Sequence, residues 1–90
     1  MAKIGSQIHV AEGRVRVITG GISFGGRYAF SATESQPARV ELAVWDEQTK
    51  AVHIEVCEGE TFEFAGQTWR VDKIHTEGVR RWYADLTRIA

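Results

Sequence analysis

The chain has 90 residues, which is enough for one domain and not for two. Its formal net charge is −1, so it lacks the basic surplus that domains binding nucleic acid or other polyanions usually carry. A single cysteine excludes an internal disulfide, and no apolar run approaches the roughly 20 residues of a membrane helix.

Apolar and polar residues alternate with period two through most of the chain, and the nine glycines fall mainly between apolar runs. This pattern is typical of short β-strands joined by tight turns. The sequence therefore predicts one all-β domain over residues 1–90, with seven to eight short strands in meander order. A small antiparallel sandwich and a partly closed barrel both fit, since closure removes edge strands that invite aggregation.

The first predicted hairpin has Glu12-Gly13 as its loop, which places Val10 opposite Val15. The glycine-rich run GGISFGG follows, over residues 20–26. Its spacing matches neither the dinucleotide-binding fingerprint nor the P-loop, and the residues after it predict a strand instead of a helix. We expect a wide, flexible turn there that could act as a lid.

The next predicted strand covers residues 27–32 and places Tyr28 and Phe30 on one side. The segment RVELAVWDEQTKAVHIEVC then predicts a hairpin with a three-residue loop over residues 47–49. This loop keeps Val44 opposite Val52, because residues that face each other across an antiparallel pair share a face. The opposite face would carry Arg39, Glu41, Ala43, Trp45, Ala51, His53, Glu55 and Cys57.

The run FEFAGQTWRV predicts a further hairpin. With Gly66-Gln67 as a two-residue type II′ turn, Phe64 faces Trp69 and Glu63 faces Arg70. Such aromatic and opposite-charge pairs stabilise a sheet by about 0.2–1 kcal/mol each. We therefore interpret these aromatic residues as part of the fold and not as a ligand site.

The last predicted strand lies within RRWYADLTRI, residues 80–89. Trp82 and Tyr83 take opposite parities there, so one of them should face outward, and the sequence does not decide which. A change of parity after Val71 indicates a β-bulge near Asp72-Lys73.

Two C-terminal runs, GETFEFAGQTWRV and WYADLTRIA, carry a pattern of glycine, acid, aromatic, glycine and tryptophan. They resemble the C-terminal half of a family of small uncharacterised β-proteins common in actinobacteria, a domain of unknown function. The resemblance covers about the last third of the chain. It implies a β-fold and carries no catalytic residue over to this sequence.

No pattern predicts a metal or a cofactor. His53 and Cys57 share one face of a strand, but at ~3.3 Å per residue they lie roughly 13 Å apart, too far for one zinc ion or for a nucleophile and its base. His9 and His75 have no partner at a suitable spacing. Four acids cluster nearby: Glu55, Glu58, Glu60 and Glu63. They indicate a solvated turn or a contact for a basic partner, and nothing indicates a catalytic carboxylate pair.

Outward aromatic residues beside arginine are the strongest candidates for a binding surface, because both types are enriched at interface hot spots. The candidate binding residues are Trp45, Arg39, His53, Trp82, Tyr83, Arg27 and Tyr28. We expect a non-catalytic domain that binds another protein or a second copy of itself, with Trp45 in the contact. A single cysteine and the lack of a signal peptide favour a cytoplasmic location, and export of the folded protein is the alternative.

Two other functions stay open. The first is a small-ligand pocket or minor enzyme at the barrel mouth under the loop Gly20–Gly26, using Arg27, Tyr28 and His53. The second is single-stranded nucleic-acid binding by aromatic platforms and a basic groove, which the acidic balance disfavours. A pocket lined by Tyr28 and His53 would favour a ligand, whereas a flat apolar patch around Trp45 would favour a protein partner.

Overall fold

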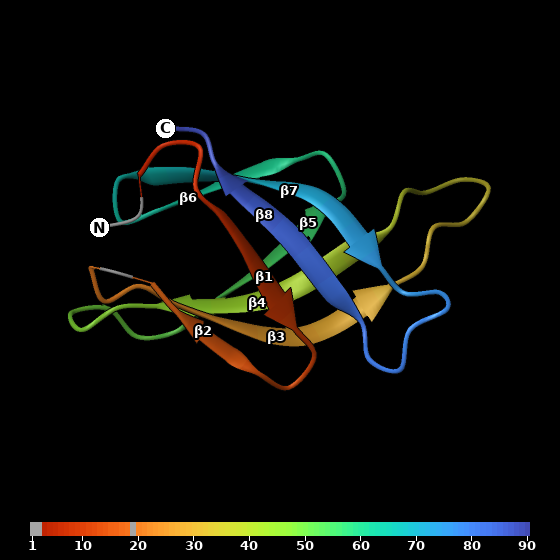
Figure 1. Cartoon of the computed structure of the whole chain (residues 1–90), viewed down its shortest axis with the longest axis horizontal. Coiled ribbons are helices and arrows are strands. Elements are labelled where there is room, and N and C mark those ends of the chain that lie inside the picture. Colours follow the sequence, from red (N-terminus) through yellow and green to blue (C-terminus); the bar gives the residue numbers. More distant parts are fainter. Residues whose placement is uncertain (1–2, 19) are drawn as a thin grey trace.

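The computed structural model describes residues 3–18 and 20–90. Eight antiparallel strands form two four-stranded sheets, which makes the fold an open all-β sandwich (Figure 1). The strands are β1 Gln7–Ala11, β2 Val15–Val17, β3 Ser23–Phe30, β4 Arg39–Trp45, β5 Val52–Cys57, β6 Thr61–Phe64, β7 Gln67–His75 and β8 Tyr83–Arg88. Sheet A has the order β1-β8-β7-β6, and sheet B has the order β2-β3-β4-β5. Residues 3–18 and 20–90 contain no helix long and apolar enough to cross a membrane.

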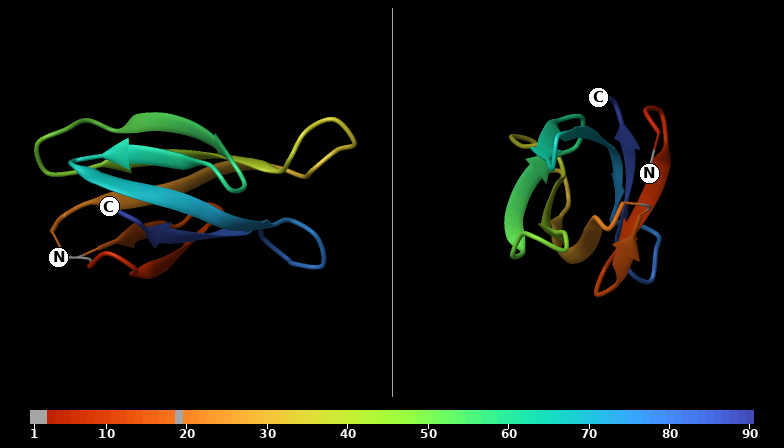
Figure 2. Two further views of the ribbon diagram at one scale, coloured as in Figure 1. Left: turned by 90° about the horizontal axis from the view of Figure 1, so that it is seen from above. Right: turned by 90° about the vertical axis from the view of Figure 1, so that its left-hand side faces the viewer.

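The hydrophobic core lies between the two sheets, which Figure 2 shows as two layers. The period-two pattern produces this core: Val40, Leu42 and Val44 of β4 are fully buried, and the residues between them stay partly exposed. Trp69 of sheet A meets Phe24 of sheet B edge to face, with ring centroids 5.2 Å apart. Burying a large apolar side chain contributes about 1.5–3 kcal/mol, so this pair holds the sheets together.

The first two strands do not form the predicted hairpin. β1 pairs with β8 in sheet A, and β2 pairs with β3 in sheet B, so the chain changes sheets at residues 12–14. Val15 and Val17 consequently lie on the outer surface, 57% and 63% exposed. The alternation of apolar and polar residues correctly predicts two strands here, but it does not identify the neighbour with which each strand pairs.

Two glycines that were predicted to lie in a flexible loop are part of β3. A Cβ on Gly26 would lie 2.2 Å from the carbonyl oxygen of Ala11, and a Cβ on Gly25 would lie 3.3 Å from the ring of Trp45. Gly26 therefore permits the close approach of β3 to the end of β1, and Gly25 makes room for a tryptophan on the outer face. The prediction of a wide turn through residue 26 is wrong, because packing of the backbone and not mobility requires these glycines.

The two later hairpins form, one with its predicted register and one without. In β4–β5 the predicted valine pairs lie opposite one another. In β6–β7 the turn is Ala65-Gly66, whose φ angles are both positive, at 51° and 77°. Phe62 therefore faces Trp69, and each residue of β6 faces a partner two positions earlier than predicted. A turn with two positive φ angles matches the twist of the strands that it joins, which explains the different register.

The C-terminal part of the chain follows the predicted parities. The register of β7 against β8 shifts between Val71 and Lys73, which confirms the β-bulge. The bulge allows both Val71 and Ile74 to face the core. Trp82 is also buried, and Tyr83 faces outward, which answers the question that the sequence left open.

Candidate binding surfaces

The outer surface of sheet B gathers most of the predicted binding residues. Arg27, Tyr28, Arg39, Trp45 and His53 all lie on this surface, because β3, β4 and β5 are neighbours in register. We call this surface the arginine–aromatic face. It consists of Val15, Val17, Arg27, Tyr28, Phe30, Arg39, Glu41, Ala43, Trp45, His53 and Glu55.

The charged groups of the arginine–aromatic face are paired within the face. Arg27 Nε donates to Glu41 Oε1 at 3.1 Å, and His53 Nδ1 lies 3.7 Å from the same oxygen. Arg39 Nε lies 3.2 Å from a carboxylate oxygen of Glu55, an ion pair without the geometry of a hydrogen bond. Arginine and glutamate balance in number, so the face carries no net charge while His53 is neutral.

The exposed aromatic surface comes mainly from Tyr28 and Phe30, which are 55% and 45% exposed. The guanidinium carbon of Arg39 lies 4.3 Å from the centroid of the Phe30 ring, and that of Arg27 lies 5.4 Å from the Tyr28 ring. Trp45 points outward as its parity predicts, but its ring packs over a glycine and is only partly exposed. Phe30 was not among the predicted binding residues, although its shared parity with Tyr28 pointed to this face.

The remaining two predicted binding residues lie elsewhere. Trp82 belongs to the core and is 8% exposed, so its assignment to a binding surface does not hold. The reason is that Trp82 shares its parity with the buried Ala84 and Leu86. Tyr83 lies on the outer surface of sheet A. The alternative of a ligand pocket under residues 20–26 loses its covering loop, since that run ends inside β3.

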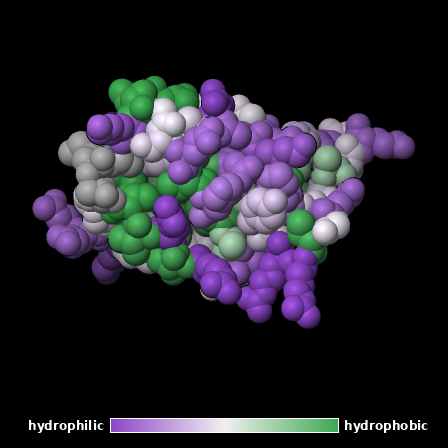
Figure 3. Space-filling view, viewed as in Figure 1, coloured by the Kyte–Doolittle hydropathy of each residue, from purple (hydrophilic) through white to green (hydrophobic). Residues whose placement is uncertain are grey.

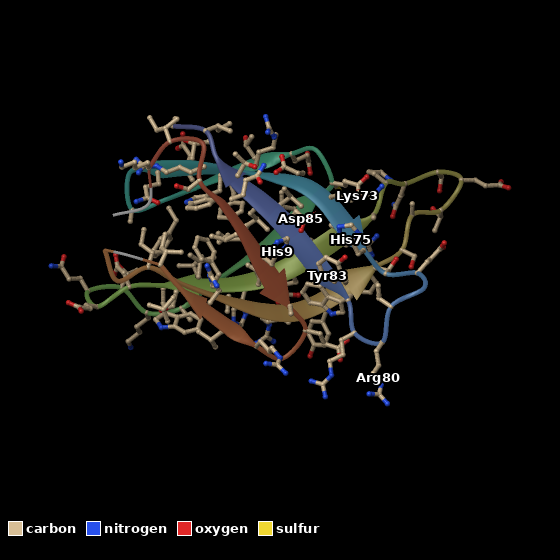
Figure 4. All side chains as sticks on the ribbon, in the orientation of Figure 1. His9, Lys73, His75, Arg80, Tyr83 and Asp85 are labelled. Atoms are coloured by element: carbon tan, nitrogen blue, oxygen red, sulfur yellow. The ribbon has the colours of Figure 1, made fainter. Side chains whose placement is uncertain are left out.

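The outer surface of sheet A holds a polar cluster that the sequence did not predict. Asp85 of β8 bonds histidines on both neighbouring strands (Figure 4). His9 Nδ1 lies 2.5 Å from one carboxylate oxygen, and His75 Nε2 lies 2.8 Å from the other. The ring of Tyr83 stacks on His75, with centroids 4.2 Å apart and 16° between the planes. We call these four residues the histidine cluster.

The histidine cluster can bind and orient, but it lacks the partners of a nucleophilic site. A neutral imidazole that donates to Asp85 keeps its second nitrogen as an acceptor. Among the described residues, no serine or cysteine side chain is bonded to His9 or His75. The same part of the chain holds no group of three or more histidine, cysteine or acidic residues arranged to hold a metal ion.

A second polar network on sheet A surrounds the bulge residue Asp72. Arg70 Nε donates to one oxygen of Asp72 at 2.6 Å, and the hydroxyl of Thr87 donates to the other. Burial acts to raise the pKa of Asp72. The hydrogen bonds from Thr87 and Arg70 and the charge of Arg70 outweigh it, so the pKa lies below its ordinary value of 3.8.

Cys57 and two of the clustered acids have structural roles. The Glu60 carboxylate accepts the backbone N–H of Cys57 at 2.9 Å, and Glu58 accepts that of Ile74 at 2.9 Å. A hydrogen bond to Glu60 raises the pKa of the Cys57 thiol, and desolvation and the charge of Glu60 raise it further. A raised pKa lowers the thiolate fraction, which makes Cys57 a poor nucleophile.

The model of a family of unknown function, DUF6406, matches residues 5–90. The match includes the N-terminal strands and therefore extends well beyond the last third of the chain. No curated protein and no solved structure matches the sequence.

Proposed function

We propose that this chain, which belongs to the DUF6406 family of unknown function, is a non-catalytic β-domain that associates with a second copy of itself through the arginine–aromatic face. The observation that carries the proposal is the exposure of Tyr28 and Phe30 beside Arg27 and Arg39. Among residues 3–18 and 20–90, four of the eight exposed large hydrophobic side chains lie on this face: Val15, Val17, Tyr28 and Phe30. Aromatic residues and arginine are the types enriched where protein interfaces are buried.

The charges of the face favour a second copy over a strongly charged partner. Arg27 and Arg39 are balanced by Glu41 and Glu55, and each arginine lies within 3.2 Å of a glutamate. A surface with equal positive and negative charge does not repel an identical surface. A twofold axis can also place each arginine near a glutamate of the other chain. An acidic or basic partner would find no unbalanced charge to pair with.

A stable dimer through this face would bury only a small part of the accessible surface of each chain. Stable interfaces bury about 800 Å² per partner, which is about one-seventh of the accessible surface of 5679 Å². The outer surface of sheet B is one of the two broad sides of the sandwich (Figure 2). Face-to-face contact of two copies would also cover Val15 and Val17, which a monomer leaves in water.

The test is the oligomeric state, measured by sedimentation velocity and light scattering from micromolar to millimolar concentration. The wild type should dimerise, and Tyr28→Ser and Phe30→Ser should each weaken the dimer by about 30-fold, because loss of a hot-spot aromatic costs about 2 kcal/mol. The control variant Ile89→Ser changes an exposed hydrophobic residue away from the face and should leave the dimer intact. Trp45→Ser is a poorer probe, because the ring of Trp45 packs over Gly25 within the chain.

Two results would contradict the proposal. One is a wild-type protein that stays monomeric at millimolar concentration. The other is an equal loss of association in Phe30→Ser and Ile89→Ser, which would place the contact elsewhere. Thermal melting of each variant shows whether the fold is retained, and the half-exposed Tyr28 and Phe30 side chains should be replaceable with little loss of stability.

A further inference from the structure

A hollow of about 700 Å³ opens beside the histidine cluster, where residues 76–82 connect β7 to β8. Its lining residues are Arg14, Val79, Arg80, Arg81 and Tyr83. The arginines come from two distant segments, the corner between β1 and β2 and the turn before β8. Figure 3 shows hydrophilic side chains projecting at this lower right end of the molecule, and Figure 4 places Arg80 on the turn.

Within residues 3–18 and 20–90, none of the three arginines of the hollow forms an ion pair. Three arginines elsewhere in the chain lie within 3.2 Å of a carboxylate, namely Arg27, Arg39 and Arg70, whereas the exposed Arg16 of β2 forms no ion pair within the described residues. The nearby Asp85 is already bonded to His9 and His75, one through each oxygen. The positive charge of the hollow is therefore available to an anion from outside the chain.

The chemistry of the lining selects the kind of anion. Guanidinium groups hold phosphate oxygens with paired N–H donors, and they do so better than lysine. Tyr83 adds a flat ring whose position is maintained by its stack on His75, and His75 is anchored in turn by Asp85. A platform that is oriented before binding lowers the entropy cost of stacking a second ring.

We propose that the hollow binds a nucleotide, with the phosphate held by Arg14, Arg80 and Arg81 and the base packed against Tyr83. The volume of the hollow falls within the roughly 300–1,000 Å³ of small-molecule sites, and Val79 supplies an apolar wall. In this arrangement His75 is a positioning residue that acts through Tyr83. None of the five lining residues belongs to the arginine–aromatic face, so nucleotide binding does not use the surface proposed for self-association.

The test is titration of the full chain with adenosine monophosphate, adenosine and inorganic phosphate, by calorimetry and NMR. The monophosphate should bind about tenfold tighter than either of its parts. Arg80→Gln should weaken this binding about tenfold. The matched control Arg16→Gln should leave it unchanged, because Arg16 is an exposed arginine of β2 that does not line the hollow. Tyr83→Leu should weaken binding of the monophosphate and leave the affinity for inorganic phosphate unchanged.

Each other outcome would overturn the proposal. Absence of monophosphate binding at millimolar concentration would exclude the site. If Arg16→Gln and Arg80→Gln lose equal affinity for the monophosphate, the attraction is diffuse and electrostatic. If Tyr83→Leu keeps the wild-type affinity for the monophosphate, the hollow is a site for inorganic anions. A single-stranded oligonucleotide that binds far more tightly than the monophosphate, with a loss in Arg16→Gln, would indicate an extended nucleic-acid surface instead.

Discussion

Replacing Gly26 with alanine should destabilise the domain by about 3 kcal/mol or more, because the new methyl group has no space. Gly26 lies where β3 passes the end of β1. The added Cβ would lie 2.2 Å from the carbonyl oxygen of Ala11 and 2.9 Å from the ring of Trp82. The Trp82 side chain can shift, but the oxygen belongs to the backbone of the corner that joins the two sheets.

The expected magnitude follows from the contacts that would have to move. Overpacking a well-packed site costs about 1–3 kcal/mol. Displacing the corner also strains two backbone hydrogen bonds, from Gly13 N to Gly26 O at 3.1 Å and from Gly26 N to Arg14 O at 3.2 Å. Each such bond contributes about 1 kcal/mol, so the total loss is about 3–5 kcal/mol out of the roughly 5–15 kcal/mol typical of a domain. The melting temperature should fall by at least ~12 °C.

The measurement is urea and thermal unfolding followed by tryptophan fluorescence and circular dichroism. Gly25→Ala is the matched control, since its Cβ would lie 3.3 Å from the side chain of Trp45 on the outer face, where the ring can tilt away. The unfolding free energy of this control should fall by no more than about 1 kcal/mol. If the stabilities of the two variants agree within about 0.5 kcal/mol, the close approach at Gly26 does not limit the fold.

Two further predictions concern ionisable groups. Because Glu60 raises the pKa of the Cys57 thiol, iodoacetamide should modify Cys57 more slowly than free cysteine. The variant Glu60→Gln should accelerate this reaction, and the control Glu63→Gln should not. Equal modification rates in the two variants would contradict the effect of Glu60. The folded-state pKa of Asp72 lies below 3.8, so ionised Asp72 stabilises the fold above that pH, and the stabilisation is lost as the pH falls through the lower folded-state value. The difference in unfolding free energy between wild type and Asp72→Asn should therefore shrink in acid, and a difference that is independent of pH would refute the assignment.

The sequence by itself determined most of the strands, the inward face of β4 and the general class of fold. Val40, Leu42 and Val44 alternate with polar residues, and this alternation reflects burial of one face whichever strand lies alongside. The β-bulge near Asp72 was predictable for the same reason, because it changes the parity of the apolar residues. The outward direction of Trp45 also followed from parity, and so did the placing of Tyr28 and Phe30 on one side of their strand.

Only the tertiary structure decided which strands pair and which distant side chains meet. The pattern around Val15 fits a hairpin with β1 as well as it fits the observed pairing with β3, because a strand shows the same alternation beside any partner. The histidine cluster requires β1, β8 and β7 to be neighbours, and the hollow requires Arg14 to lie near Arg80. Loop closure penalises a partner strand that is more distant in sequence by only about 0.6 kcal/mol for each doubling of loop length. The pairing of strands therefore depends on long-range packing and not on their separation in the sequence.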